Sequence, residues 1–293
     1  MIDMHIHVVP PNLEGVGPLS QGLKGTVDHV ARIVRDQMRA GGFTQALAMG
    51  SFSHSETDPL GVRRTLEIAE QVPGLHAIGI ANPERNDPGF LRRVEEEIQS
   101  GKVIALKAYL GYLHYYPCDP GYQPYYRLAE KYQIPFIYHT GDTYSPNAKL
   151  KYAHPLGVDE VAVDFPKVNF VLAHVGNPWM MDAAQVVYKN MNVWADLSGL
   201  LLGDDSDFQE PTHRVVHEEV IARLRTAFRY TERPNRFLYG SDWPLAPMKS
   251  YRGFIEEAIP EDYHEMIFSE NARRLFKLKG IGEGNRGRES GKG

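Results

Sequence analysis

A chain of 293 residues is long enough for one large domain, and α/β barrels commonly have this length. The formal net charge of −5, with no long run of Lys or Arg, argues against nucleic acid as a partner. The single cysteine, Cys118, excludes an internal disulfide. With no signal-peptide pattern and no apolar run of membrane-spanning length, these features predict a cytoplasmic protein.

Short apolar segments rich in β-branched residues alternate along the chain with longer amphipathic segments. Eight strands are predicted, at residues 2–8, 45–50, 76–81, 103–109, 135–139, 169–174, 193–197 and 236–240. A helix is predicted after each strand, at residues 26–40, 61–71, 89–100, 123–132, 157–163, 180–189, 214–229 and 261–276. Gly or Pro separates several helices from the next strand, which is typical of regular β-α units.

Eight such repeats predict an α/β fold of the (β/α)₈ TIM-barrel type, with parallel strands and right-handed crossovers. An open, doubly wound sheet is the alternative, but it would ordinarily carry a Gly-rich phosphate-binding turn after an early strand, and this sequence has none. Residues 1–279 are expected to form a single barrel. Residues 280–293, rich in Gly, Glu, Arg and Lys, are expected to form a flexible polar tail.

The first predicted strand carries two histidines, His5 and His7, separated by one residue. Successive side chains of a strand point to opposite faces, so these two imidazoles project on the same side. Burying such a pair is costly unless a metal or a hydrogen-bond partner satisfies both rings. The pair therefore indicates half of a metal site, with a chance pair on an exposed edge as the alternative.

Other candidate ligands occur where three further strands end. His139 ends the fifth strand, His174 ends the sixth, and Asp242 follows the eighth; Lys107 lies in the fourth. A lone histidine at a strand end is more often a hydrogen-bonded core residue than a ligand. Because strand ends converge in a TIM barrel, the combination predicts a metal site at the C-terminal face.

The motifs at these positions resemble those of the amidohydrolase superfamily, in its family 2 branch of metal-dependent TIM-barrel hydrolases, which is related to aminocarboxymuconate-semialdehyde-type decarboxylases. They are Asp3-Met4-His5-Ile6-His7, His139-Thr140-Gly141, His174-Val175-Gly176, Gly240-Ser241-Asp242-Trp243-Pro244 and Asn271-Ala272-Arg273-Arg274-Leu275-Phe276. The resemblance implies that His5, His7, His139 and Asp242 hold a divalent cation, usually zinc. It also implies that His174 either binds a second ion or acts on the substrate.

Lys107 leaves open whether the site holds one ion or two. A carboxylated lysine at the matching strand bridges two ions in binuclear members of the superfamily, which would make Lys107 a sixth ligand. In a mononuclear site the lysine could instead hold a substrate carboxylate as a point charge. A simple ion pair with a nearby acid is the third alternative.

The resemblance implies hydrolysis of an amide, lactone or related ester bond of a small molecule. Asp242 would act as general base, while His174 or the metal polarises the carbonyl group. The alternative is non-oxidative decarboxylation of an aromatic or unsaturated carboxylic acid, by enzymes that typically carry an additional arginine; a barrel with a vestigial metal is a third possibility. Substrate contacts are expected from Arg85, Tyr109 and Trp243, and both a monomer and a homo-oligomer are left open.

Overall fold

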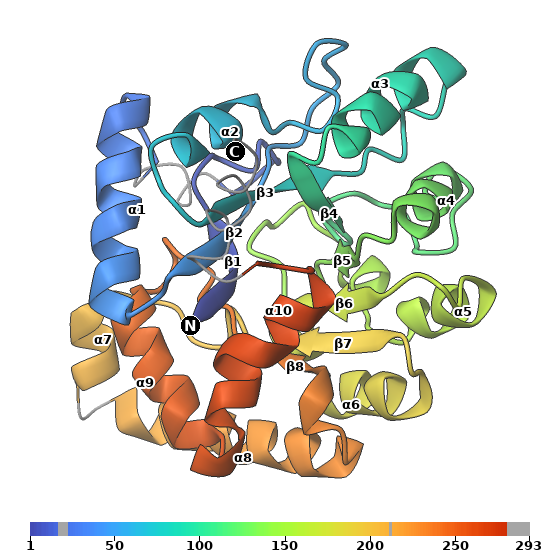
Figure 1. Cartoon of the computed structure of the whole chain (residues 1–293). Coiled ribbons are helices and arrows are strands. Elements are labelled where there is room, and N and C mark those ends of the chain that lie inside the picture. The colour runs from blue at the N-terminus through green and yellow to red at the C-terminus, as the bar shows by residue number, and fades with distance from the viewer. Residues whose placement is uncertain (17–22, 211–212, 280–293) are drawn as a thin grey trace, which may run out of the picture.

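The computed structural model describes residues 1–16, 23–210 and 213–279, so the predicted tail at 280–293 lies outside the described residues. Eight parallel strands pair in chain order in a nearly closed barrel, which confirms the predicted fold class (Figure 1). The strands are β1 (Ile2–His7), β2 (Gln45–Met49), β3 (Leu75–Ile80), β4 (Val103–Ala108), β5 (Phe136–Tyr138), β6 (Phe170–Leu172), β7 (Val193–Asp196) and β8 (Phe237–Leu238).

Helices surround the strands on the outside (Figure 1). They are α1 (Val27–Gly41), α2 (Arg63–Ala69), α3 (Pro88–Gln99), α4 (Gln123–Tyr132), α5 (Gly157–Asp164), α6 (Met180–Lys189), α7 (Asp205–Gln209), α8 (Arg214–Thr231), α9 (Met248–Ala258) and α10 (Asn271–Leu275). Helix α1 shows why they form: the Thr26 hydroxyl caps its first turn, and Gly42 ends it at a φ of 75°. None of the described helices has the length and apolarity needed to cross a membrane.

The eighth predicted helix, at residues 261–276, is present as a helical segment, but it is not a regular α-helix. That segment consists of a 3₁₀ turn (Glu261–Tyr263), a π-helical turn (Met266–Glu270) and the short helix α10. The helix that directly follows β8 is α9, which had not been predicted although its buried residues recur every three or four positions. Helix α10 instead packs Ala272 and Leu275 into the same apolar cluster as Ile2 and Met4 of β1, so it closes one end of the barrel interior.

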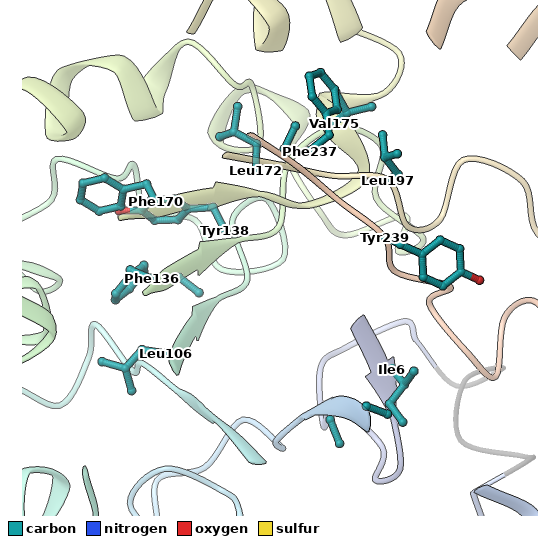
Figure 2. Packing of buried hydrophobic residues seen from close by; sticks show 14 of the residues in the cluster. Ile6, Leu106, Phe136, Tyr138, Phe170, Leu172, Val175, Leu197, Phe237 and Tyr239 are labelled. Atoms are coloured by element: carbon teal, nitrogen blue, oxygen red, sulfur yellow. The ribbon is translucent and has the colours of Figure 1, made fainter. Parts of the chain in front are cut away.

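The outer faces of the strands form an aromatic layer under the helices. The rings of Phe136, Tyr138 and Phe170 lie together on neighbouring strands (Figure 2), and the Tyr138 and Phe170 centroids are 5.8 Å apart. Tyr126 of α4 packs on them from outside, 4.9 Å from Phe136. Burial of these large rings anchors the helices to β5 and β6.

An extra residue in β1 turns its two histidines into the barrel. Between Asp3 and Ile6, β1 advances three residues while β2 advances two. Met4 belongs to the apolar cluster inside the barrel, whereas Ile6 packs under the helices. Without this bulge, strict alternation would place His5 and His7 on the side opposite Met4. The bulge therefore decides that both imidazoles face inward.

Strand β4 has a similar irregularity. It advances from Val103 to Leu106 while β3 advances by two residues. Ala105 packs inside the barrel and Leu106 outside, which leaves Lys107 on the inner side. In both β1 and β4, the polar residues that point into the barrel therefore follow a bulge.

The barrel closes through the residues that follow β8. The amide of Asp242 donates to the carbonyl oxygen of His5 at 2.8 Å, and the amide of His7 donates to that of Trp243 at 2.7 Å. Ile6 and Trp243 form a parallel bridge between the same segments. Closure therefore places the Asp242 side chain beside the two histidines of β1.

The aromatic layer generates a stability prediction. Replacement of the fully buried Phe170 by Ala leaves a cavity against Tyr126 and Tyr138, and we expect the free energy of unfolding to fall by about 3–5 kcal/mol. Val216→Ala, at a position 51% exposed on α8, should change it by less than about 0.5 kcal/mol. Denaturant titration measures both variants, and equal effects would contradict the proposed role of the layer.

Candidate metal centre

Three side chains from opposite ends of the sequence meet at the barrel closure. Ligand atoms of His5, His7 and Asp242 all lie within 4.8 Å of one another. The Asp242 Oδ1 atom is 3.5 Å from His5 Nε2 and 3.3 Å from His7 Nε2, and all three residues are buried. Among the described residues this oxygen has no hydrogen-bond partner. A buried carboxylate oxygen in that state is available to a cation.

His139 and His174 lie beside this group, in the turns that follow β5 and β6. The two predicted strands end earlier than expected, so both histidines lie outside regular β-structure. His174 adopts a φ of 59° and Val175 a φ of 40°, a backbone conformation that costs energy for residues with a Cβ atom. In this conformation His174 Nε2 lies 3.2 Å from His139 Nδ1, and its ring centroid is 5.1 Å from that of His5.

The outer nitrogens of three imidazoles are bound to protein acceptors. His5 Nδ1 lies 2.6 Å from Asp196 Oδ2, and His139 Nε2 lies 2.8 Å from the Asp142 carbonyl oxygen. His174 Nδ1 lies 3.1 Å from the Ser198 carbonyl oxygen. Carboxylate and carbonyl oxygens only accept, so each of these nitrogens carries the proton. The opposite nitrogen of each ring then presents a lone pair inward, as in metal-binding histidines.

The spacing of these inward atoms fits a divalent cation. His139 Nδ1 and His174 Nε2 direct lone pairs at each other across 3.2 Å, an arrangement that needs a proton or a cation to be favourable. Nitrogen ligands at about 2.0–2.1 Å from a tetrahedral zinc ion are about 3.3 Å apart. The distances of 3.3 and 3.5 Å within the group of His5, His7 and Asp242 agree with that value, and His139 and His174 form a second pair with a separation of 3.2 Å.

The protonation states at the site also suit cation binding. Burial lowers the pKa of His5 and His139 well below the usual range and that of His174 to about 4, so these rings are neutral near pH 7. Burial would raise the pKa of Asp242, but the neighbouring histidines outweigh it and hold that pKa far below its ordinary value. Neutral imidazoles and an ionised carboxylate are the forms that bind metals.

Lys107 is completely buried and forms no ion pair within the described part of the chain. Its Nζ has no hydrogen-bond partner there. Burial lowers its pKa to about 8, although the negative charges of Asp196 and Asp242 partly oppose this. The structure thus lacks the simple ion pair that was one of the three alternatives for this residue.

A cleft of about 180 Å³ opens over these side chains. Its outer walls are aromatic and apolar and include Tyr109, Tyr112 and Tyr144. The other residues that line it are His5, His7, Pro11, Leu13, Val16, Lys107, His139, Asp142, Thr143, His174, Asn177, Gly199, Leu200, Leu202, Asp242 and Leu245.

The three predicted substrate residues have different positions. Tyr109 lines the cleft, and its buried hydroxyl has no hydrogen-bond partner among the described residues. Arg85 does not line it: the guanidinium pairs with Glu56, donates to the carbonyl oxygen of His54 and lies 4.3 Å from the Phe90 ring centroid. Trp243 is buried in the apolar core and is not among the residues that line the cleft.

The sequence analysis missed the contribution of β7. Asp196 ends this strand and accepts from His5, while Ser198 Oγ donates to Asp196 at 2.7 Å. Burial raises the pKa of Asp196 to about 6, against the opposing effects of His174 and Ser198, so it is ionised at neutral pH. Gly199 follows with a φ of +63°, and a Cβ there would lie 2.5 Å from His174 Nδ1. The polar segment after an apolar strand was a signal for this site.

The family follows from a comparison with known proteins. A family model described as amidohydrolase matches residues 2–278, so the chain belongs to this amidohydrolase family. No match is found among curated proteins.

Several solved structures share the fold. The 2,6-dihydroxybenzoate decarboxylase from Rhizobium is 17% identical, with a TM-score of 0.67 over 95% of this chain and 99% of that one. A probable 2-pyrone-4,6-dicarboxylic acid hydrolase from Acinetobacter baumannii is 15% identical, with a TM-score of 0.66 over 94% and 99%. A 5-carboxyvanillate decarboxylase from Novosphingobium aromaticivorans, with bound manganese, is 14% identical, with a TM-score of 0.62 over 94% and 96%.

The contact between Asp196 and His5 generates a prediction on metal affinity. Asp196→Asn removes the charged acceptor that fixes the His5 tautomer, and we expect metal affinity to fall about 10–100-fold. Asp142→Asn is the matched control, because His139 contacts the backbone oxygen of Asp142 rather than its carboxylate. Its affinity should stay within about threefold of the parent. Titration of the metal-free proteins with Zn²⁺ or Mn²⁺ measures both, and equal losses would contradict the assignment.

Proposed function

We propose that this chain is a metal-dependent hydrolase that cleaves an amide, lactone or related ester bond of a small molecule. The observation that carries the proposal is the convergence of four imidazoles and the unpartnered Asp242 Oδ1 in one cleft. The negative net charge fits a small molecule rather than nucleic acid as the partner.

We assign a divalent cation to His5, His7, His139 and Asp242, with His174 as a ligand of a second ion or as a group that acts on the substrate. A bound cation would act as a Lewis acid and lower the pKa of water at the site. Zinc is the ion that the resemblance implies, while the manganese in one structural neighbour makes Mn²⁺ the second ion to test.

Asp242 is the proposed proton acceptor. Its carboxylate is ionised at neutral pH and faces the cleft, so it can take a proton from the attacking water and pass it to the leaving group. His174 is neutral, and its Nδ1 proton is directed at the Ser198 carbonyl oxygen. The lone pair on its Nε2 favours a role as ligand or proton acceptor over that of a hydrogen-bond donor to the substrate carbonyl.

Decarboxylation of an aromatic or unsaturated carboxylic acid is the second candidate. It is favoured by the three tyrosines that line the cleft together with Lys107, which suit a planar anion. Hydrolysis ranks first because no arginine occurs among the described residues that line the cleft, and Arg85 is bound elsewhere.

The assignment predicts which variants lose metal. His5→Ala and His139→Ala remove ligands, and we expect loss of both bound metal and activity. Asp242→Asn keeps a similar shape but removes the proton acceptor, and turnover should fall by about 10²–10⁴-fold. Metal analysis of the purified variants and an activity assay test this, and full turnover in any of the three would refute the assignment.

A substrate screen separates the two candidate reactions. The metal-loaded protein is assayed with panels of lactones, amides and aromatic carboxylic acids, with acid release and CO₂ release as separate readouts. We expect acid release from a lactone or amide that disappears on treatment with a chelator. Metal-dependent CO₂ release without hydrolysis would replace the first candidate with the second.

A further inference from the structure

The geometry points to an anion-binding subsite formed by Lys107 Nζ and the Tyr109 hydroxyl, which binds a single carboxylate group of the substrate beside the metal centre. This inference rests on the proposed function, because it places the group next to the site where the reaction would occur. It also makes Lys107 a substrate-binding amine rather than a bridging ligand.

The Lys107 amine and the Tyr109 hydroxyl both come from the end of β4 and face the same cleft. Lys107 lies in β4 and Tyr109 directly follows it, so the two side chains, two residues apart, share the inner side of the barrel. Both line the cleft, and Lys107 Nζ is 5.6 Å from the centroid of the Tyr109 ring. A single small group that enters the cleft can therefore approach both.

Neither group has a hydrogen-bond partner in the described parts of the chain. Lys107 is fully buried and Tyr109 is 4% exposed, yet the Nζ atom and the hydroxyl group both lack a hydrogen bond. Buried polar groups are nearly always paired, since an unpaired one costs free energy. Two unpaired donors that face the same cleft are therefore a sign of a missing acceptor. A carboxylate, with two oxygens that only accept, can satisfy both.

Tyr112 shows the contrast within the same cleft. Its hydroxyl accepts a hydrogen bond from the amide of Tyr144 at 2.8 Å, so it already has a protein partner. Tyr144 is exposed, so solvent can reach its hydroxyl, whereas Lys107 and Tyr109 are buried without a partner among the described residues.

The charges around Lys107 favour the amine over a carboxylated lysine. Two buried carboxyl groups, of Asp196 and Asp242, already act on the Lys107 amine. A carboxylated Lys107 would add a third acidic group, whereas the ammonium group offsets one negative charge. With the amine and one divalent cation, the two carboxylates leave one positive charge for a substrate carboxylate.

The number of cations in the cleft limits the substrate to one carboxylate. Lys107 is the only Lys or Arg among the described residues that line it, and the remaining walls are largely aromatic and apolar. A second carboxylate that pointed into these walls, away from the proposed cation, would lack a cationic partner, which is costly. We therefore expect selectivity for planar monocarboxylates over neutral analogues and over dicarboxylates.

Calorimetry on the metal-loaded full chain tests the subsite with benzoate, its neutral analogue benzamide and the dicarboxylate isophthalate. We expect benzoate to bind at least about tenfold more tightly than either of the others. Lys107→Met should weaken benzoate binding at least about tenfold and leave benzamide binding and the metal content unchanged. Lys102→Met, which removes an exposed lysine before β4, is the matched control and should bind benzoate like the parent.

Tyr109→Phe provides an independent test, since it keeps the ring and removes only the hydroxyl. It should weaken benzoate binding about threefold or more, and it decides the question if Lys107→Met fails to fold.

Undetectable benzoate binding to the parent, or unchanged affinity in the folded variants, would overturn the subsite. Loss of one metal equivalent in Lys107→Met, or an added CO₂ in the intact mass of the parent, would overturn it in favour of a bridging lysine. If the parent protein binds no metal, the proposed function is overturned. The comparison of benzoate with benzamide and isophthalate would still test the anion-binding subsite.

Discussion

The hydrogen bonds that join β1 to the residues after β8 are the constraint on which the rest of the site depends. They close the barrel, because β8 itself is only two residues long, and they fix Asp242 against the backbone of His5. The same bonds set the distance from the Asp242 carboxylate to both imidazoles of β1. Asp242 itself adopts a φ of 63°, an uncommon conformation for a residue with a side chain, which the surrounding hydrogen bonds maintain.

Around this closure the barrel interior changes from apolar to polar along its axis. At one end, α10 and the inward residues of the strands form an apolar cluster that excludes water. Beyond the bulges of β1 and β4, the inward positions carry His5, His7 and Lys107, whose polar groups are costly to bury without partners. Asp196 of β7 supplies one partner from the barrel itself, while the inward nitrogens and the Lys107 amine remain available to a cation and a substrate.

Membership of the amidohydrolase family is consistent with this arrangement. The solved structures that share the fold are described as a probable hydrolase and as decarboxylases. The difference between such reactions depends on the loops that surround the cleft rather than on the barrel. In this chain those loops contribute tyrosines and leucines but no arginine among the described residues that line the cleft. The anion subsite at Lys107 and Tyr109 would therefore be the main determinant of which carboxylates are accepted.

The sequence by itself determined the strand and helix order, because the alternation of β-branched and amphipathic segments is a local property of the chain. It also indicated His5, His7, His139, His174 and Asp242, since each occupies a strand end in a fold where such ends converge. It missed α9, because the helical turns at 261–276 carry similar apolar spacing and satisfy the expectation of a helix after β8 equally well. Three features were decided by the tertiary structure alone. They are the bulges that turn His5, His7 and Lys107 inward, the hydrogen bond between Asp196 and His5, and the ion pair between Arg85 and Glu56. Each depends on register or contact between segments far apart in the chain, which no local pattern encodes.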